Sequence, residues 1–301
     1  MGDAKVAFVT GASRGIGRAI ALDLARHGFE IAAAARSVDR SVVDWAGTVE
    51  ETCSTAREFG RRALPVKLDL TQLDDVRRAV DAVMAEFGRI DVLVTSATNI
   101  DFSPDGTYLN EFVATSWEAL ERHIQVNITS SMLLLRLVLP VMYAQGSGIV
   151  MSVTQASAWL EFPDLPMPGQ GICGMAIPVT RGVTDRLAPA LKREVAPHGV
   201  TILTFDPGMT ISNASERYAD TLKAGYTPES AHSVLVSARA ATYIATCRDP
   251  SVYNGAWVSA LDLVRGRGLL TEAEIFPDWR EGVQEVTSIP PLVAATTDPV
   301  R

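Results

Sequence analysis

A glycine-rich segment near the start of the chain has the composition of a phosphate-binding turn. An apolar run, residues 6–9, ends at Thr10, and Gly11, Gly15 and Gly17 follow before a run of helix-forming residues. A phosphate can approach the backbone closely only where side chains are absent. The N–H groups at the start of a helix are unpaired and carry partial positive charge. A strand, a glycine turn and a helix start in this order therefore predict a pyrophosphate site.

The elements that would position this turn alternate regularly along the chain. Short apolar segments at residues 30–35, 63–68, 91–95, 148–153 and 200–205 alternate with longer helical segments, and residues 256–260 add a candidate seventh strand. This alternation is typical of βαβ units. It predicts an α/β fold, a doubly wound, mostly parallel sheet of about seven strands between two helix layers, the Rossmann-type three-layer sandwich. We expect one such domain over residues 1–265, and over residues 266–301 an extension that packs on the domain or on a neighbouring subunit.

Cap-forming residues mark several predicted helix starts. Two Thr-x-x-Glu segments, residues 48–51 and 115–118, have the spacing of a capping box. Thr71 is expected to cap the helix after the third strand, and residues 182–196 are expected to form one helix. His123 is expected on a helix surface, with no functional role.

The strand ends converge on one predicted crevice, because ligands of open α/β sheets bind beyond the carboxyl ends of the strands. Those ends are followed by residues 10–17, Arg36, residues 95–98, Thr154 and residues 207–212. The residue just past the second strand faces the adenosine ribose, where an acid suits a free 2′-hydroxyl and an arginine suits a 2′-phosphate. Arg36, with Arg14 near the same pocket, therefore favours NADP(H) over NAD(H).

Charge, cysteine usage and hydropathy limit the partners. The net charge is −8 and the basic residues are scattered, so a nucleic-acid partner is not expected. Three widely spaced cysteines argue for a reducing compartment, the cytoplasm, and against a disulfide framework or a zinc site. No metal site is predicted. No run approaches about 18 uninterrupted apolar residues, so no membrane partner is expected either.

The segment TGASRGIG, residues 10–17, closely resembles the cofactor motif of the short-chain dehydrogenase/reductase family, and the resemblance extends over residues 5–260. In that family the acid after the third strand contacts the adenine amino group, and the next residue lies against the ring. A Pro-Gly segment after the sixth strand holds the nicotinamide carboxamide. The resemblance therefore implies cofactor contacts at Gly11, Ser13, Arg14, Gly15, Ile16, Gly17, Arg36, Asp69, Leu70, Pro207, Gly208, Thr210 and Ser212.

Reductases of the resembled family use an asparagine, a serine, a tyrosine and a lysine, and this chain keeps only part of that set. Asn127 in VNIT matches the asparagine, and Thr154 falls at the serine position. Counting without gaps places Ile177 at the tyrosine and Arg181 at the lysine. Isoleucine cannot exchange a proton, and arginine stays charged and cannot act as a base. Ordinary carbonyl reduction by the family's mechanism is therefore not supported.

A long apolar, proline-rich segment, residues 156–172, would lie beside this centre. Trp159 and Phe162, together with Cys173 and Ile177, are expected to line an apolar substrate pocket. Asp164 in such surroundings would have a raised pKa and could donate a proton near neutral pH. Arg181 could stabilise an oxyanion or hold a carboxylate. The candidate catalytic set is Asn127, Thr154, Asp164 and Arg181.

Three functions follow from these residues. The first is an NADP(H)-dependent oxidoreductase with a non-standard proton donor, which transfers hydride to a conjugated C=C, imine or carbonyl group of a small apolar substrate. Some members of the resembled family that reduce conjugated C=C bonds also lack the tyrosine. The second is a non-redox isomerase or cyclase on the same scaffold, and the third is a catalytically idle NADP(H)-binding protein. The resemblance also implies a homodimer or homotetramer, paired through the helices after the fourth and fifth strands.

Overall fold

A seven-stranded parallel sheet forms the centre of the computed structural model, which describes residues 4–40, 47–99, 110–154, 176–212, 231–277 and 285–292. The strand order is β3-β2-β1-β4-β5-β6-β9, and every neighbouring pair is parallel. The strands are β1 (Val6–Thr10), β2 (Glu30–Ala35), β3 (Ala63–Lys67), β4 (Val92–Thr95), β5 (Gly148–Val153), β6 (Val200–Asp206) and β9 (Trp257–Ser259). The predicted doubly wound α/β fold is confirmed.

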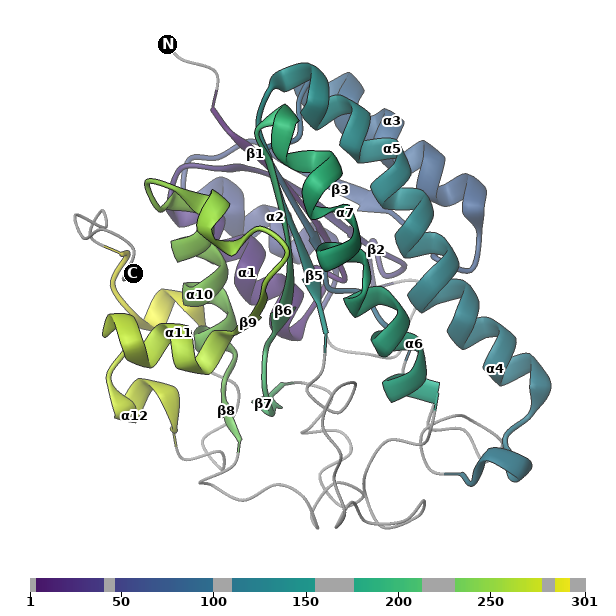
Figure 1. Cartoon of the computed structure of the whole chain (residues 1–301). Helices are drawn as coiled ribbons and strands as arrows, with labels where there is room; N and C mark the ends of the chain where they lie inside the picture. The colour runs from purple at the N-terminus through teal and green to yellow at the C-terminus, as the bar shows by residue number, and fades with distance from the viewer. Residues whose placement is uncertain are drawn as a thin grey trace.

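Helices cover both faces of the sheet, as Figure 1 shows. One layer holds α1 (Gly15–Arg26), α2 (Val49–Glu58), α10 (Val234–Thr246) and α11 (Ala260–Arg267). The other holds α3 (Leu73–Phe87), α4 (Trp117–Ile124), α5 (Ser130–Gln145), α6 (Ala176–Asp185) and α7 (Leu187–Val195). Short elements complete the described chain: η1 (Phe112–Ala114), η4 (Ala196–His198), β7 (Thr210–Ile211), β8 (His232–Ser233), η5 (Pro250–Tyr253), α12 (Glu272–Ile275) and η7 (Val286–Ser288).

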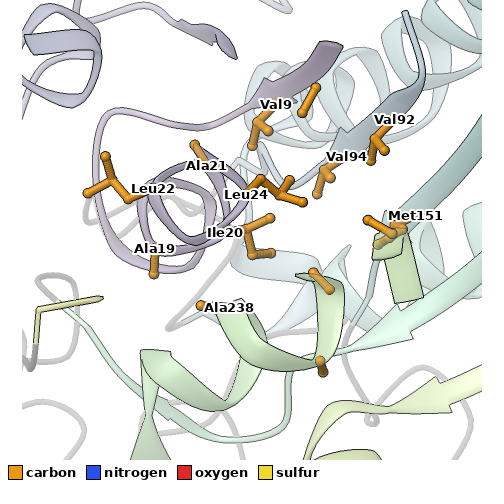
Figure 2. Close-up of a cluster of buried hydrophobic side chains, with 14 of the residues drawn as sticks. Val9, Ala19, Ile20, Ala21, Leu22, Leu24, Val92, Val94, Met151 and Ala238 are labelled. Carbon is orange, nitrogen blue, oxygen red and sulfur yellow. The ribbon is translucent and has the colours of Figure 1, made fainter. Parts of the chain in front are cut away.

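Alternate residues of β1 point into opposite layers, as the twofold repeat of a strand requires. Ala7 and Val9 belong to the core under α1 and α10, whereas Val6 and Phe8 belong to the core under α3 and α5. In Figure 2, Ile20 of α1 lies between the sheet residues and α10. Ile20 is completely buried, and burying a side chain of this kind contributes about 1.5–3 kcal/mol. This packing fixes the start of α1 against the end of β1.

Three local expectations need correction. Ser116, rather than Thr115, is the N-cap of α4 and accepts a hydrogen bond from the Ala119 N–H, so the predicted box is one residue out of register. The N-cap of α3 is Gln72, because the Thr71 hydroxyl donates to Asp69 instead. The predicted single helix over residues 182–196 is two helices, α6 and α7, separated at Arg186. The capping box at residues 48–51 is confirmed.

A continuous helical stretch, Trp117–Gln145, joins α4 to α5 through a π-helical segment, η2 (Gln125–Thr129). By length and composition it is the one described helix that could cross a membrane. Its apolar side chains include Leu134 and Val138, which are buried in the core between the sheet and α3. Burial in that core accounts for only part of the apolar composition, because 39% of the most apolar stretch is buried.

The chain beyond α11 lies against α1. Ile275, Val286 and Ile289 are buried in the same core as α1 and α10. Arg26 of α1 donates to the carbonyl oxygens of Val286 (2.6 Å) and Ile289 (2.7 Å). The described part of the C-terminal segment therefore contacts the domain of its own chain.

Candidate functional site

A cleft of about 300 Å³ opens at the carboxyl ends of β1, β2, β3 and β4. The glycine turn forms one wall, and the segments that follow β2, β3 and β4 form the others. Of the residues predicted from sequence, those that line it are Gly11, Ser13, Arg14, Gly15, Ile16, Gly17, Arg36, Asp69, Leu70 and Ser212. Pro207, Gly208 and Thr210 lie in the adjoining segment after β6 and are not among the lining residues.

Two glycines are required by close approaches of the backbone. A Cβ on Gly11, which has φ +70°, would lie 2.8 Å from the Ala97 backbone nitrogen. A Cβ on Gly17 would lie 2.5 Å from the Gly11 carbonyl oxygen. Such distances are far inside van der Waals contact, so neither position accepts a side chain without a shift of backbone. The turn, the start of α1 and the segment after β4 are thereby held together around the cleft.

The wall beside β2 carries two arginines. Arg14 donates to the Ser37 hydroxyl (3.0 Å) and to the Ser13 hydroxyl (3.3 Å), and both serines are buried. The Arg36 side chain is exposed at the cleft and makes no hydrogen bond or ion pair within the described residues. Two guanidinium groups beside two hydroxyl groups form a site suited to an anion.

The opposite wall presents an oriented carboxylate. Asp69 Oδ1 accepts hydrogen bonds from the Thr71 N–H (2.9 Å) and the Thr71 hydroxyl (2.8 Å). Leu70 lies beside it, and its carbonyl oxygen accepts from the Ser130 hydroxyl (2.5 Å). Because both bonds from Thr71 end on Oδ1, Oδ2 remains available to a donor in the cleft.

Asn127 connects three elements near the far end of the cleft. Its Nδ2 donates to the Thr180 hydroxyl of α6 (3.1 Å). Its Oδ1 accepts from the Thr98 hydroxyl and the Asn99 N–H, both 3.2 Å away. The side chain is buried. Asn127 lies within η2, where the wider helical turn marks an interruption of regular α-helix.

The expectation that His123 lies on the surface is wrong. It is completely buried, and its Nδ1 lies 3.5 Å from the Asn99 Nδ2. α4 packs against α6, so the helix face that carries His123 is covered. The sequence contains no local signal for this contact, because the two helices are far apart along the chain.

Thr154, Arg181 and Asp185 form a buried group where β5 meets α6. The Thr154 hydroxyl donates to Asp185 Oδ2 (2.6 Å), and Arg181 Nη1 donates to the Val153 carbonyl oxygen (2.7 Å). Burial lowers the pKa of Arg181 to about 10, and the nearby charge of Asp185 opposes that shift. Arg181 therefore remains a cation at neutral pH. Asp185 was not singled out from the sequence.

The position expected to carry an acid is apolar. Ile177, on the first turn of α6, is buried. Asp164, Trp159, Phe162 and Cys173 lie outside the described residues.

The segment after β6 is held by a second histidine that sequence reasoning missed. The His232 N–H donates to the Met209 carbonyl oxygen (2.9 Å), where β7 pairs with β8. His232 is buried, and its Nε2 occupies the space where a Cβ on Gly208 would lie, 2.5 Å from that position. Burial lowers the pKa of His232.

Comparisons with known proteins agree with this geometry. Residues 5–167 match the family model for short chain dehydrogenase. A 3-oxoacyl-[acyl-carrier-protein] reductase of Staphylococcus epidermidis is 28% identical over 222 residues, which cover 73% of this chain and 80% of that protein. A peroxisomal 2,4-dienoyl-CoA reductase of Danio rerio is 28% identical over 287 residues, which cover 89% of this chain and 86% of that protein. A solved short-chain type dehydrogenase/reductase from Mycobacterium marinum has the same fold, with a TM-score of 0.71, 24% identity and coverage of 85% of this chain and 93% of that one.

Proposed function

The chain belongs to the short-chain dehydrogenase/reductase family and is an oxidoreductase of that family, and from this premise we propose that it is NADP(H)-dependent and acts without a tyrosine acid. Its proposed reaction is hydride transfer to a conjugated C=C, imine or carbonyl group of a small apolar substrate. The observation that carries the proposal is the combination of a complete phosphate cradle with the buried Ile177 in place of the family tyrosine.

The cleft residues fit a nicotinamide dinucleotide. Gly11 and Gly17 permit the close packing that brings bare backbone and the first N–H groups of α1 to the cleft, where a pyrophosphate would be stabilised. Asp69 Oδ2 would accept a hydrogen bond from the adenine amino group, and Leu70 would lie against the adenine ring. Pro207, Gly208, Thr210 and Ser212 would hold the nicotinamide end. When bound, the coenzyme supplies the hydride.

The preference for NADP(H) rests on the two arginines. A 2′-phosphate adds about 1.5 to 2 negative charges and strong acceptor oxygens to the ribose. The Arg36 guanidinium has no partner among the described residues, and Arg14 is fixed beside it by two serine hydroxyl groups. An NAD(H) site would instead place an acid where Arg36 stands.

The reaction class follows from the missing phenol. Reduction of an isolated ketone leaves an alkoxide that needs a positioned acid. A conjugated system leaves a delocalised anion that solvent or Asp164 can protonate, and an iminium ion becomes neutral when hydride is added. The similarity over most of the chain to a protein named 2,4-dienoyl-CoA reductase is consistent with a conjugated substrate.

We propose cytoplasmic location and assembly as a homodimer or homotetramer. The outer face of α4, α5 and α6 exposes Trp117, Met132 and Val179, which are apolar side chains that a second copy would cover. Sedimentation at several protein concentrations tests the assembly.

A direct test combines binding and turnover. Fluorescence titration with NADPH and NADH gives the two dissociation constants, and NADPH absorbance is then followed with enone, imine and ketone panels. Tight NADPH binding with turnover of an enone or imine is the expected result. Binding without turnover of any panel member would favour a non-catalytic coenzyme-binding protein, and lack of binding would favour a non-redox activity. Replacement of Asp164 by Asn should lower turnover strongly if Asp164 is the acid.

A further inference from the structure

Thr154 stands between two segments that line the cleft. It follows β5, whose neighbours in the sheet are β4 and β6. The segment after β4 lines the cleft with Ser96, Ala97, Thr98 and Asn99, and the segment after β6 lines it with Ser212. Thr154 itself is buried and is not among the residues that line the cleft, but its place between these two segments puts the end of β5 beside the region proposed to hold the nicotinamide end.

Its hydrogen bond to Asp185 makes Thr154 an acceptor, and no longer a donor, toward a substrate. A hydroxyl group has one proton and two acceptor lone pairs. The Thr154 proton is donated to Asp185 Oδ2 over 2.6 Å, so the hydroxyl can offer only lone pairs to a substrate. A carbonyl oxygen has no proton to donate. A group that carries N–H or O–H complements Thr154 as it stands.

Two groups of opposite charge, Asp185 and Arg181, lie at the end of β5 beside Thr154. Asp185 is buried, and its charge opposes the lowering of the pKa of Arg181, which lies one helical turn earlier in α6. Arg181 itself donates to the Val153 carbonyl oxygen, so its guanidinium is anchored at the end of β5. The carboxylate is the group bonded to the Thr154 hydroxyl, so it strengthens that oxygen as a hydrogen-bond acceptor, while the charge of Arg181 balances the charge of Asp185.

We propose that Thr154 is a hydrogen-bond acceptor for the substrate, that Asp185 is the residue that positions it, and that the substrate class is a protonated imine bearing an N–H. This inference rests on the proposed function and narrows its substrate. It also agrees with Ile177, because an iminium ion needs no acid.

The step balances without a proton donor. With the coenzyme bound, the iminium carbon would accept its hydride, and the C=N π electrons would become a lone pair on nitrogen. The substrate would leave as a neutral amine, and the positive charge would pass to the oxidised coenzyme. The N–H remains on nitrogen throughout and can stay bonded to Thr154.

Matched probes separate charge from the N–H. The protonated form of 2-phenyl-1-pyrroline carries both, its N-methyl iminium salt keeps the charge and lacks the N–H, and 3-phenylcyclopent-2-enone and butyrophenone are neutral. We expect kcat/KM for the protonated imine to exceed that of the N-methyl salt about tenfold or more, the range of one hydrogen bond to a charged group. Equal reactivity of the two iminium ions, or a higher kcat/KM for the enone or ketone, overturns the proposal.

Variants of Thr154 and Asp185 test whether these residues cause the preference for the N–H iminium ion over the N-methyl iminium ion. Thr154→Val should abolish the discrimination between N–H and N-methyl, and Thr154→Ser should restore it. Asp185→Asn should reduce it about tenfold and should improve the neutral substrates relative to the imine. Thr242→Val changes another fully buried threonine, in α10, and should leave the discrimination intact. Retention of the wild-type ratio in Thr154→Val overturns the proposal.

A binding measurement covers variants that do not fold and substrates that do not turn over. In the wild-type protein with NADP⁺, 2-phenylpyrrolidine, which is an ammonium ion in neutral buffer, should bind about tenfold tighter than 2-phenyltetrahydrofuran. Equal binding contradicts the inference. If NADPH binds and the enone is the better substrate, the inference fails while the proposed function stands. If NADPH does not bind, both fail.

Discussion

The polar groups at the two ends of the candidate site have different hydrogen-bond partners. At the end of the cleft proposed to bind phosphate, Arg36 and the start of α1 face the cleft. At the end proposed to carry the reaction, Asn127, Thr154 and Arg181 direct their hydrogen bonds to other protein groups. The first region is arranged for a ligand that brings its own charge, and the second is largely satisfied within the protein.

This difference indicates at which end side chains can be substituted without loss of the fold. A phosphate cradle depends on backbone shape, so its glycines are fixed by packing and its arginines are open to substitution. A buried polar group depends on every partner, because an unsatisfied donor or acceptor costs about 1–3 kcal/mol. Four changes, given from the largest expected effect to the smallest, test the contrast.

Gly17→Ala should have the largest effect. The added methyl group meets the Gly11 carbonyl oxygen at 2.5 Å, so α1 must move away from the turn. We expect a loss of about 3 kcal/mol in the free energy of unfolding and loss of measurable NADPH binding. Urea denaturation and fluorescence titration measure these. Gly266→Ala is the matched control, because this helical glycine has nothing within 4 Å of its Cβ position and should become slightly more stable. Normal NADPH binding by Gly17→Ala would contradict the proposal that the glycine turn binds the pyrophosphate.

Asn127→Ala should destabilise the reaction end. It removes the acceptor of Thr98 and Asn99 and the donor to Thr180, so the free energy of unfolding should fall by about 2 kcal/mol. The NADPH dissociation constant should change less than threefold, roughly within 0.6 kcal/mol. Gln72→Ala, at an exposed amide, serves as the control in the same urea titrations. A stable Asn127→Ala protein would show that its hydrogen bonds carry little of the fold.

Arg36→Ala should weaken NADPH binding about tenfold and leave NADH binding nearly unchanged, because the proposed partner of Arg36 is the 2′-phosphate, which NADH lacks. Arg40→Ala removes another exposed arginine, which pairs with Glu51, and should alter neither dissociation constant. Equal weakening of NADPH and NADH by Arg36→Ala would exclude the 2′-phosphate as its partner.

His232→Phe should flatten the pH dependence of stability. The unfolded imidazole takes up a proton near its ordinary pKa of 6.5, whereas burial lowers the pKa of the folded group. Wild-type stability should therefore fall as the pH decreases below 6.5, by at most about 1.4 kcal/mol per pH unit. Urea midpoints at pH values from about 7 to 5 measure the slope. His198→Gln, at an exposed histidine, should keep the wild-type slope.

The sequence predicted the framework well where the signal is local. Strand β5 has the predicted bounds, residues 148–153, and the capping box at residues 48–51 is formed. Most of the residues predicted at the phosphate end line one cleft. Alternating apolar segments and a glycine turn act over a few residues, so they can be read without knowledge of the neighbours.

The reaction end could be predicted only in its residue types. The pattern identified Thr154 and Arg181, but it did not indicate that Asp185, 31 positions along the chain, accepts a hydrogen bond from the Thr154 hydroxyl. It placed His123 on the surface because the packing of α4 on α6 leaves no periodic signal of its own. His232 beneath Gly208 went unnoticed for the same reason.

By itself the sequence determined the α/β fold and the glycine turn, and it predicted isoleucine at the position expected for the tyrosine. Tertiary structure alone decided which way each polar side chain of the reaction end donates. The physical reason is range: strand and turn preferences arise from adjacent residues, whereas the direction of a buried hydrogen bond depends on which distant segments the sheet order brings together.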